Sequence, residues 1–196
     1  MKKKTKIIIL IAIIIFLFII FSIIYINRCK IFKNGYNKNS QEIVESILNI
    51  SSYEAIVEIK IEGNKNQNEY KMKQKYLGPE NNFQEIIEPE NISGLKISRE
   101  ANKLILENST LNLKTVIENY SYISENKLDL NSFVEDYKKD KKANYVEDDE
   151  IIMETNYSLK KTLYINKNTG KPIKMIVEDD IKNNKIYILY NEVDIK

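Results

Sequence analysis

The chain has 196 residues, a formal net charge of +2, one Cys and no His. The missing His excludes Ser-His-Asp and Cys-His catalytic systems and any metal site with a His ligand. A single Cys excludes an intrachain disulfide and a Cys-rich metal site. With 43% hydrophobic and 30% charged residues, the composition is that of a globular protein. The length fits one domain plus an appendage.

The first predicted element is a membrane anchor. A basic head at residues 1–6 precedes an apolar run over 7–26, in which Ser22 and Tyr25 are the only polar members. A helix of this length spans about 30 Å, the hydrocarbon thickness of a bilayer. A cleaved secretory signal has a shorter apolar region of about 7–15 residues, so a retained single-pass signal-anchor is favoured. The positive-inside rule puts residues 1–6 in the cytoplasm and the rest of the chain outside.

Cys29 lies just after this anchor, where a bacterial lipoprotein carries its acylated Cys. A lipoprotein signal requires small residues directly before that Cys, whereas Ile26, Asn27 and Arg28 stand here. Two interpretations stay open: a lipidated Cys29, for which the preceding residues fit poorly, and a free thiol beside the membrane.

The charge is unevenly distributed along the chain. Residues 1–33 hold seven of the 30 basic residues and none of the 28 acidic ones, so the remainder carries a net charge of −5. A mildly acidic exported part argues against a nucleic-acid partner and against adhesion to an anionic membrane surface. We interpret residues 27–39 as a polar linker and 40–196 as one extracytoplasmic domain.

The domain begins with a predicted helix and continues with strands. Asn39 is a helix cap with Glu42 in the capping-box position, and apolar residues at 43, 44, 47 and 48 share one helix face, which is expected to cover a sheet rather than a partner. From Tyr53 the hydrophobic period changes to two, which predicts half-buried antiparallel strands over 53–61 and 70–76. The outward Lys71, Lys73 and Lys75 are expected to pair with Glu54, Glu58 and Glu62, a basic binding strip being the alternative.

Later segments complete an α+β fold. Val116, Ile117 and Tyr120 indicate one short helix, and apolar residues over 130–137 indicate another, followed by a solvated charged run at 138–142. The last third is a predicted antiparallel meander. A curved antiparallel sheet with helices on its concave side is the economical arrangement. The further predicted strands are 83–88, 95–99, 103–107, 151–157, 161–166, 173–178 and 186–191.

The sequence shows no catalytic constellation. The acidic clusters at 147–150 and 178–180 lack the spacing and the Gly bend of a calcium loop, so solvated turns are the favoured interpretation. No Gly-rich phosphate loop, Ser-x-x-Lys motif or distinct carboxylate pair is present. We therefore predict a non-enzymatic binding or accessory protein with no catalytic, cofactor-binding or metal-binding residue. Partner-binding residues cannot be named from the sequence; exposed Tyr and Ile on an edge strand are the first place to expect them.

The C-terminal meander carries a family resemblance. Residues 163–175 read Leu-Tyr-Ile-Asn-Lys-Asn-Thr-Gly-Lys-Pro-Ile-Lys-Met, a strand, a turn and a second strand that begins with Gly-x-Pro, and the strand 186–191 follows. This pattern resembles the LolA/LolB/RseB-like lipoprotein-carrier superfamily, and within it the clostridial germination lipoprotein (GerS) and GerS-related proteins. The resemblance covers about residues 40–196.

The resemblance implies a LolA-like fold, an open and strongly curved antiparallel β half-barrel partly filled by helices. It also implies a non-enzymatic accessory role in sporulation and germination, in which the protein binds and supports a zinc-dependent cortex N-acetylmuramoyl-L-alanine amidase at the cell wall. An extracytoplasmic lipid or lipoprotein carrier or sensor is the alternative, and a homodimer is a further option. The expected location is the cell membrane, with the forespore intermembrane space as one suitable compartment.

Overall fold

The computed structural model describes residues 39–63, 67–78, 81–100, 103–118, 128–180 and 183–196. The predicted anchor at 7–26 and Cys29 lie outside these ranges. Among the described residues, no helix is both long enough and apolar enough to cross a membrane. Lys38–Lys196 form one compact unit, whose fold is given below.

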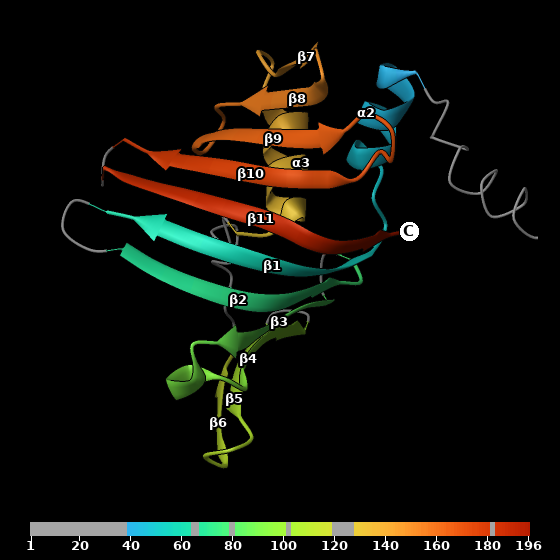
Figure 1. Cartoon of the computed structure of the whole chain (residues 1–196). Helices are drawn as coiled ribbons and strands as arrows, with labels where there is room; N and C mark the ends of the chain where they lie inside the picture. The colour runs from blue at the N-terminus through green and yellow to red at the C-terminus, as the bar shows by residue number, and fades with distance from the viewer. Residues whose placement is uncertain (1–38, 64–66, 79–80, 101–102, 119–127, 181–182) are drawn as a thin grey trace, which may run out of the picture. The chain divides into compact units, whose positions relative to one another are not determined.

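The strands of the described residues form one antiparallel sheet with the order β6-β5-β4-β3-β2-β1-β11-β10-β9-β8-β7 (Figure 1). The pairing of β1 with β11 joins the first strand to the last, so β6 and β7 are left as the two edges. The strands are β1 (Tyr53–Glu62), β2 (Gln67–Tyr76), β3 (Asn81–Glu88), β4 (Leu95–Glu100), β5 (Lys103–Asn108), β6 (Leu113–Ile117), β7 (Asn144–Glu147), β8 (Glu150–Thr155), β9 (Lys160–Asn166), β10 (Pro172–Asp179) and β11 (Asn184–Ile195).

Two α-helices and one short 3₁₀ helix, η1 (Glu90–Ile92), accompany this sheet in the described ranges. Helix α2 (Ser40–Leu48) begins after Asn39, whose side chain accepts a hydrogen bond from the Gln41 amide at 3.3 Å. Helix α3 (Leu130–Lys139) begins after Asp129, which accepts from the Ser132 amide at 2.6 Å. Both caps satisfy amides that a helix start leaves without a backbone partner.

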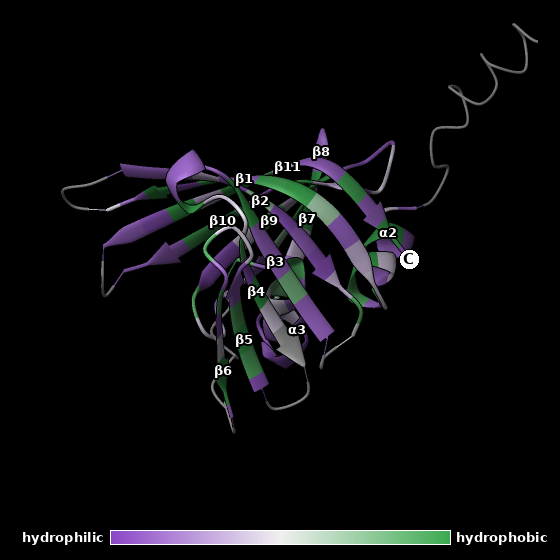
Figure 2. Cartoon of the chain, turned by 90° about the horizontal axis from the view of Figure 1, so that it is seen from below, coloured by the Kyte–Doolittle hydropathy of each residue, from purple (hydrophilic) through white to green (hydrophobic). Residues whose placement is uncertain are grey.

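Helix α3 lies within the curve of the sheet (Figure 2). Alternate residues of β1 point toward it, because successive side chains of a strand face opposite sides. We call this side the inner face, and it carries the buried Tyr53, Ala55, Val57 and Ile59. The opposite, outer face carries charged residues such as Glu54, Glu58 and Lys60.

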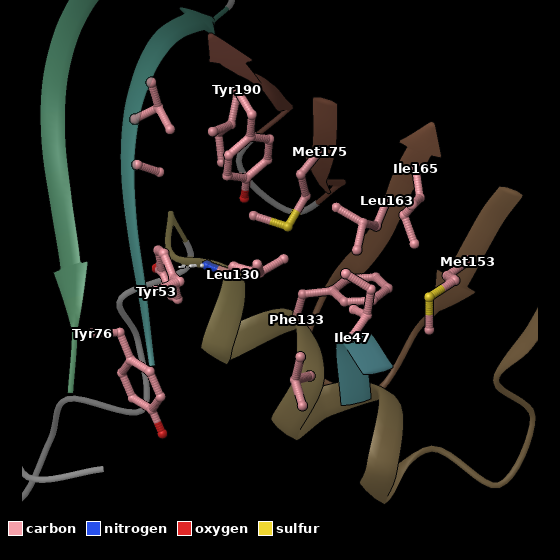
Figure 3. Packing of buried hydrophobic residues seen from close by; sticks show 14 of the residues in the cluster. Ile47, Tyr53, Tyr76, Leu130, Phe133, Met153, Leu163, Ile165, Met175 and Tyr190 are labelled. Carbon is pink, nitrogen blue, oxygen red and sulfur yellow. Dashed lines mark hydrogen bonds between the residues drawn. The ribbon is translucent and has the colours of Figure 1, made fainter. Parts of the chain in front are cut away.

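The core lies between the inner face and the two helices. Phe133 of α3 is fully buried and lies beside Ile47 of α2, with Leu163 and Met175 of the sheet nearby (Figure 3). Strands β8–β11 contribute Tyr190, which is 8% exposed, and seven apolar side chains with an exposed fraction of 0%, namely Ile151, Met153, Leu163, Ile165, Met175, Val177 and Ile188.

Most of the predicted elements are confirmed, including the α+β class, the helices at the start of the domain and at 130–139, and the C-terminal meander. The predicted helix at Val116, Ile117 and Tyr120 is wrong where it is described: Val116 and Ile117 belong to β6. The β-branched run Thr115-Val116-Ile117 favours a strand, and pairing with β5 supplies the hydrogen bonds. Tyr120 lies outside the described residues.

Candidate protein-binding surface

Buried hydrogen bonds fasten the N-terminal end of α3 to the inner face. The Leu130 amide donates to the Tyr53 hydroxyl at 3.1 Å, as the dashed line in Figure 3 shows. The Gln74 amide group on β2 donates to the Leu128 carbonyl at 2.9 Å. Asn82 on β3 donates to the second carboxylate oxygen of Asp129 at 2.6 Å. Three strands therefore hold the start of this helix.

A buried ion pair fastens the C-terminal half of α3. Lys161 of β9 is 1% exposed, and its ammonium lies 2.8 Å from the Asp136 carboxylate. The same nitrogen donates to the Ser132 carbonyl and hydroxyl oxygens, each at 3.1 Å. Ser158 donates to Asp136 as well. A buried charge pair whose remaining hydrogen-bonding groups are satisfied is costly to break, because either partner alone would be left uncompensated.

The contact between Ser132 and Lys161 has the residue types of a Ser-Lys catalytic dyad, but its geometry does not supply a base. An ammonium has three donor hydrogens and no acceptor, and Lys161 has three acceptors, one of them the Asp136 carboxylate. Without a lone pair on Lys161, nothing in this contact removes the Ser132 proton. The pair holds the helix in place.

Burial shifts the pKa values of polar groups at and near the start of α3. Burial raises the pKa of Asp129 to about 6, and the hydrogen bonds from Ser132 and Asn82 offset part of this effect. Burial also raises the pKa of the Tyr53 and Tyr190 hydroxyls well above their usual range, and the nearby Asp129 charge adds to both shifts. In the described part, the Gln84 side-chain nitrogen and the Tyr190 hydroxyl are buried without a hydrogen-bond partner.

The sheet is less well covered toward its β6 edge. All five residues of β6 are exposed. Four large apolar side chains of this edge and of the preceding turn are between 38% and 63% exposed, and we call them the edge patch: Leu111, Leu113, Val116 and Ile117. An edge strand with exposed apolar side chains is a template for another chain, since the amides and carbonyls on its outer side can extend the ladder.

The opposite edge, β7, is protected against such pairing. It has four residues and ends at Glu147, and the acidic Asp148 and Asp149 follow it. Glu147 forms an ion pair with Lys167 at 2.6 Å, and this pair lowers the pKa of the Glu147 carboxyl. Short length and charge are the usual protections of a sheet edge. Tyr145 and Val146 are exposed there, but flanked by charge.

The other residues singled out in the sequence have structural surroundings. Lys73 and Lys75 pair with Glu54 at 2.6 and 3.6 Å, as predicted, whereas Lys71 lies 3.9 Å from Glu88. Glu58 and Glu62 were expected to pair with this lysine stripe, but Glu58 accepts from Asn191 and Glu62 binds Lys60. Strand register alone does not decide these partners, since Lys71 stands directly opposite Glu58.

The acidic clusters lie at strand ends and the turns next to them: 147–150 joins β7 to β8, and 178–180 ends β10. Within the described ranges, no group of three or more acidic, His or Cys side chains could hold a metal ion. Glu178, the most enclosed member of its cluster, lies 2.6 Å from Lys160 and 2.8 Å from Lys185. Two ammonium groups on one carboxylate leave little attraction for a further cation.

No family model matches this chain, and no curated protein sequence matches it significantly. Several solved structures are similar to it. A LolA superfamily protein from Nitrosomonas europaea is 15% identical, with 81% of this chain and 94% of that chain covered and a TM-score of 0.46. The complex of the CwlD amidase with the GerS lipoprotein from Clostridioides difficile gives 20% identity, 80% and 89% coverage and a TM-score of 0.42.

The complex of MucA with MucB from Pseudomonas aeruginosa is 7% identical over 81% of this chain and 57% of that chain, with a TM-score of 0.45. The similar structures thus include a member of the LolA superfamily and a GerS complex. At these identities the likeness is one of fold alone.

Proposed function

We propose that this chain is a non-enzymatic, membrane-anchored accessory protein whose extracytoplasmic domain binds another protein through the edge patch. The observation that carries the proposal is that all five residues of β6 are exposed, together with the apolar side chains of the edge patch. A protein partner that adds a strand here gains main-chain hydrogen bonds and buries four large side chains at once.

The fastening of α3 supports a binding role over a carrier role. A carrier that opens its concave side would have to displace α3 from the sheet. This displacement would break the Lys161–Asp136 pair and the bonds of Tyr53, Gln74 and Asn82. By contrast, contact at β6 needs no displacement of a buried group.

We propose a cell-wall N-acetylmuramoyl-L-alanine amidase as the partner and sporulation and germination as the setting. The family resemblance of residues 40–196 motivates this choice. Because this chain has no His, the metal ligands of such an amidase would have to come from the partner. The chain would contribute surface and shape.

The binding test uses the full chain in lipid nanodiscs and the purified amidase encoded in the same genome. Biolayer interferometry should detect binding to the wild type. The double variant Leu113→Glu with Ile117→Glu should lose it, since two charges would enter a desolvated contact. Leu77→Glu is the matched control, because Leu77 is 58% exposed and Leu113 is 60% exposed. Equal binding by all three proteins would place the contact elsewhere.

A test in cells addresses the setting. Deletion of the gene should lower cortex muramic-δ-lactam and impair germination, and the edge variant should behave like the deletion while remaining at normal abundance. Normal muramic-δ-lactam and normal germination after deletion would contradict the role in sporulation and leave protein binding as a separate question.

A lipid or lipoprotein sensor is the second candidate. The buried Gln84 nitrogen and Tyr190 hydroxyl favour it, because two unpaired polar groups on the inner face could be satisfied by a ligand. Native mass spectrometry of the full chain released from detergent would detect a retained lipid. Its consistent absence would count against this candidate.

A further inference from the structure

Strand β6 and the residue that follows it carry opposite charges on either side of an apolar centre. Residues 114–118 read Lys-Thr-Val-Ile-Glu, with Val116 midway between Lys114 and Glu118. These three are exposed, and as alternate residues they stand on one face of the sheet. A strand with this order of charges is complementary to an antiparallel copy of itself.

The charges select one register for such a pair. With a two-fold axis at Val116, each Lys114 stands opposite Glu118 of the second copy. Cβ atoms directly opposite each other in an antiparallel pair are about 4.5–5.5 Å apart, which is close enough for an ion pair. An axis at Thr115 would instead set Lys114 opposite Val116, and an axis at Lys114 would set two lysines opposite each other.

Neighbouring charges of β5 extend this pattern. Lys114 lies 3.8 Å from Glu107, and Glu118 lies 2.8 Å from Lys103. In the paired arrangement Lys114 would lie between Glu107 of its own copy and Glu118 of the second copy. Lys103 of the second copy would continue this row of alternating charge, and the two-fold axis produces the row twice. Because like charges directly opposite each other destabilise a strand pair, such rows disfavour the other registers.

The apolar residues of this edge would be covered by the same pairing. The Val116 side chains of the two copies would meet at the axis, and Thr115 would stand opposite Ile117. In the single chain Val116 is 43% exposed and Ile117 is 38% exposed. Burial of this apolar surface and new main-chain hydrogen bonds favour pairing, as they do in the addition of a strand to a sheet edge.

We propose that β6 pairs antiparallel with β6 of a second copy of this chain, with Val116 at the two-fold axis. The five residues of β6 form a smaller contact than a stable soluble dimer needs, because such interfaces bury about 800 Å² per partner. The inference therefore rests on the anchor of the proposed function, since confinement to one membrane raises the effective concentration of the copies. A paired edge is withheld from the amidase, so pairing would regulate the proposed binding site.

Cross-linking of the full chain in phosphatidylcholine vesicles tests the register, with Cys29→Ser so that one new Cys decides the result. Val116→Cys should form an intermolecular disulfide on mild oxidation, because residues at the axis come within the Cα separation of about 4.4–6.8 Å that a disulfide requires. Leu113→Cys is the matched control, since two copies of this position would lie about 20 Å apart. Thr115→Cys reports the alternative register. Non-reducing electrophoresis measures the cross-linked fraction.

Charge reversals in the Val116→Cys background test the ion pairs. Lys114→Glu should lower the cross-linked fraction about fivefold or more, because it sets like charges opposite each other twice. Addition of Glu118→Lys should restore the fraction to within about twofold of the parent, since opposite charges meet again. Lys139→Glu on α3 is the control and should have no effect, because the Lys139 side chain is 55% exposed, close to the 59% of Lys114, but lies away from β6.

Failure of pairing can be told apart from failure of the proposed function. Flotation of the vesicles reports whether the chain is anchored, and nanodiscs that hold one chain each leave β6 free for the amidase. The proposal is overturned if Val116→Cys cross-links no more than Leu113→Cys, if Thr115→Cys cross-links better than Val116→Cys, or if the double charge reversal does not restore cross-linking.

Discussion

Strands β8–β11 and strands β4–β6 belong to the same sheet but bury their side chains to different degrees. In β8–β11, seven apolar side chains have an exposed fraction of 0%. In β4–β6, Ile105 alone is buried among the side chains that the structure describes. The difference follows the hydrophobic core, because all seven side chains of the first region belong to the cluster that α2 and α3 complete, whereas Ile105 does not.

Under the proposed function, the first region provides stability and the second provides recognition. Around α3, buried polar bonds and a buried ion pair fix one arrangement of helix and sheet. Toward β6 the sheet keeps apolar side chains in solvent, which lowers its own stability but leaves them available to a partner. The predictions below test this division, beginning with the largest expected effect.

Truncation of an apolar side chain should lower the free energy of unfolding far more in the core between α3 and β8–β11 than in β4–β6. Phe133→Ala should lower the free energy of unfolding by about 3–5 kcal/mol, because it removes a fully buried ring. Leu113→Ala should lower it by less than about 0.5 kcal/mol, since that side chain is 60% exposed. Urea unfolding followed by circular dichroism measures both. Similar losses in the two variants would contradict the division.

Removal of one partner of the buried ion pair should lower the free energy of unfolding nearly as much as Phe133→Ala does. Asp136→Ala leaves the Lys161 ammonium buried without its counter-charge, and a loss of about 3–5 kcal/mol is expected in the same unfolding experiment. Glu135→Ala, on the neighbouring position of α3, removes a half-exposed contact with Lys139 at 4.0 Å and a hydrogen bond from Asn131, and it should cost far less. The double change Asp136→Leu with Lys161→Met should recover much of the stability, which a merely steric defect would not allow.

Asp129 should make the stability depend on pH in an unusual direction. Its folded pKa of about 6 lies above the ordinary value of 3.8, so the folded state binds the proton more tightly than the unfolded state. The stabilising contribution is therefore complete below pH 3.8 and is lost as the pH rises through about 6. Above that range the protein bears the cost of a buried carboxylate.

Asp129→Asn removes this dependence, and Asn is an equally good helix cap. Relative to the wild type, the variant should gain up to about 2–3 kcal/mol at pH 7.5 and almost nothing at pH 4. Denaturant unfolding at the two pH values measures the difference. A variant that is less stable than the wild type at pH 7.5 would show that the carboxylate is favourably bound in its site.

The smallest effect is expected for the outer-face pairs. Glu54→Gln removes the partner of Lys73 and Lys75, all three being close to half exposed. Solvent and salt screen such pairs, so the variant should unfold slightly more easily at low salt and like the wild type at high salt. A large loss that persists at high salt would mean that the outer face contributes to stability as the core does.

Local patterns in the sequence predicted most of the individual strands and both helices. The period of two in β1 and the turn at 166–170 are local signals, and the structure has them as predicted. The short strand β6 was mistaken for a helix, because five residues are too few for either period to be distinguished. β7 has four residues and was not predicted for the same reason.

The edge patch could not be located from the sequence because its position depends on strand order. Which strand becomes an edge is decided by the distant pairing of β1 with β11. The fastening of α3, in contrast, left a signal that was overlooked. Alternate residues of a strand point to the same face. Lys161 alternates with the apolar Leu163 and Ile165, and Gln74 lies between Met72 and Tyr76 in the same way. The sequence therefore indicated one polar residue on the inner face in each of these strands.

Hydrogen exchange of the full chain in nanodiscs, measured with and without the amidase, tests the central claim most directly. We expect slow exchange in α3 and β8–β11 in both states, and added protection on binding confined to β5 and β6. Exchange at these edge amides should slow because a partner strand covers them. Protection that appears instead in β8–β11 or α3, or no change in β6 on binding, would contradict the assignment of β6 as the recognition edge.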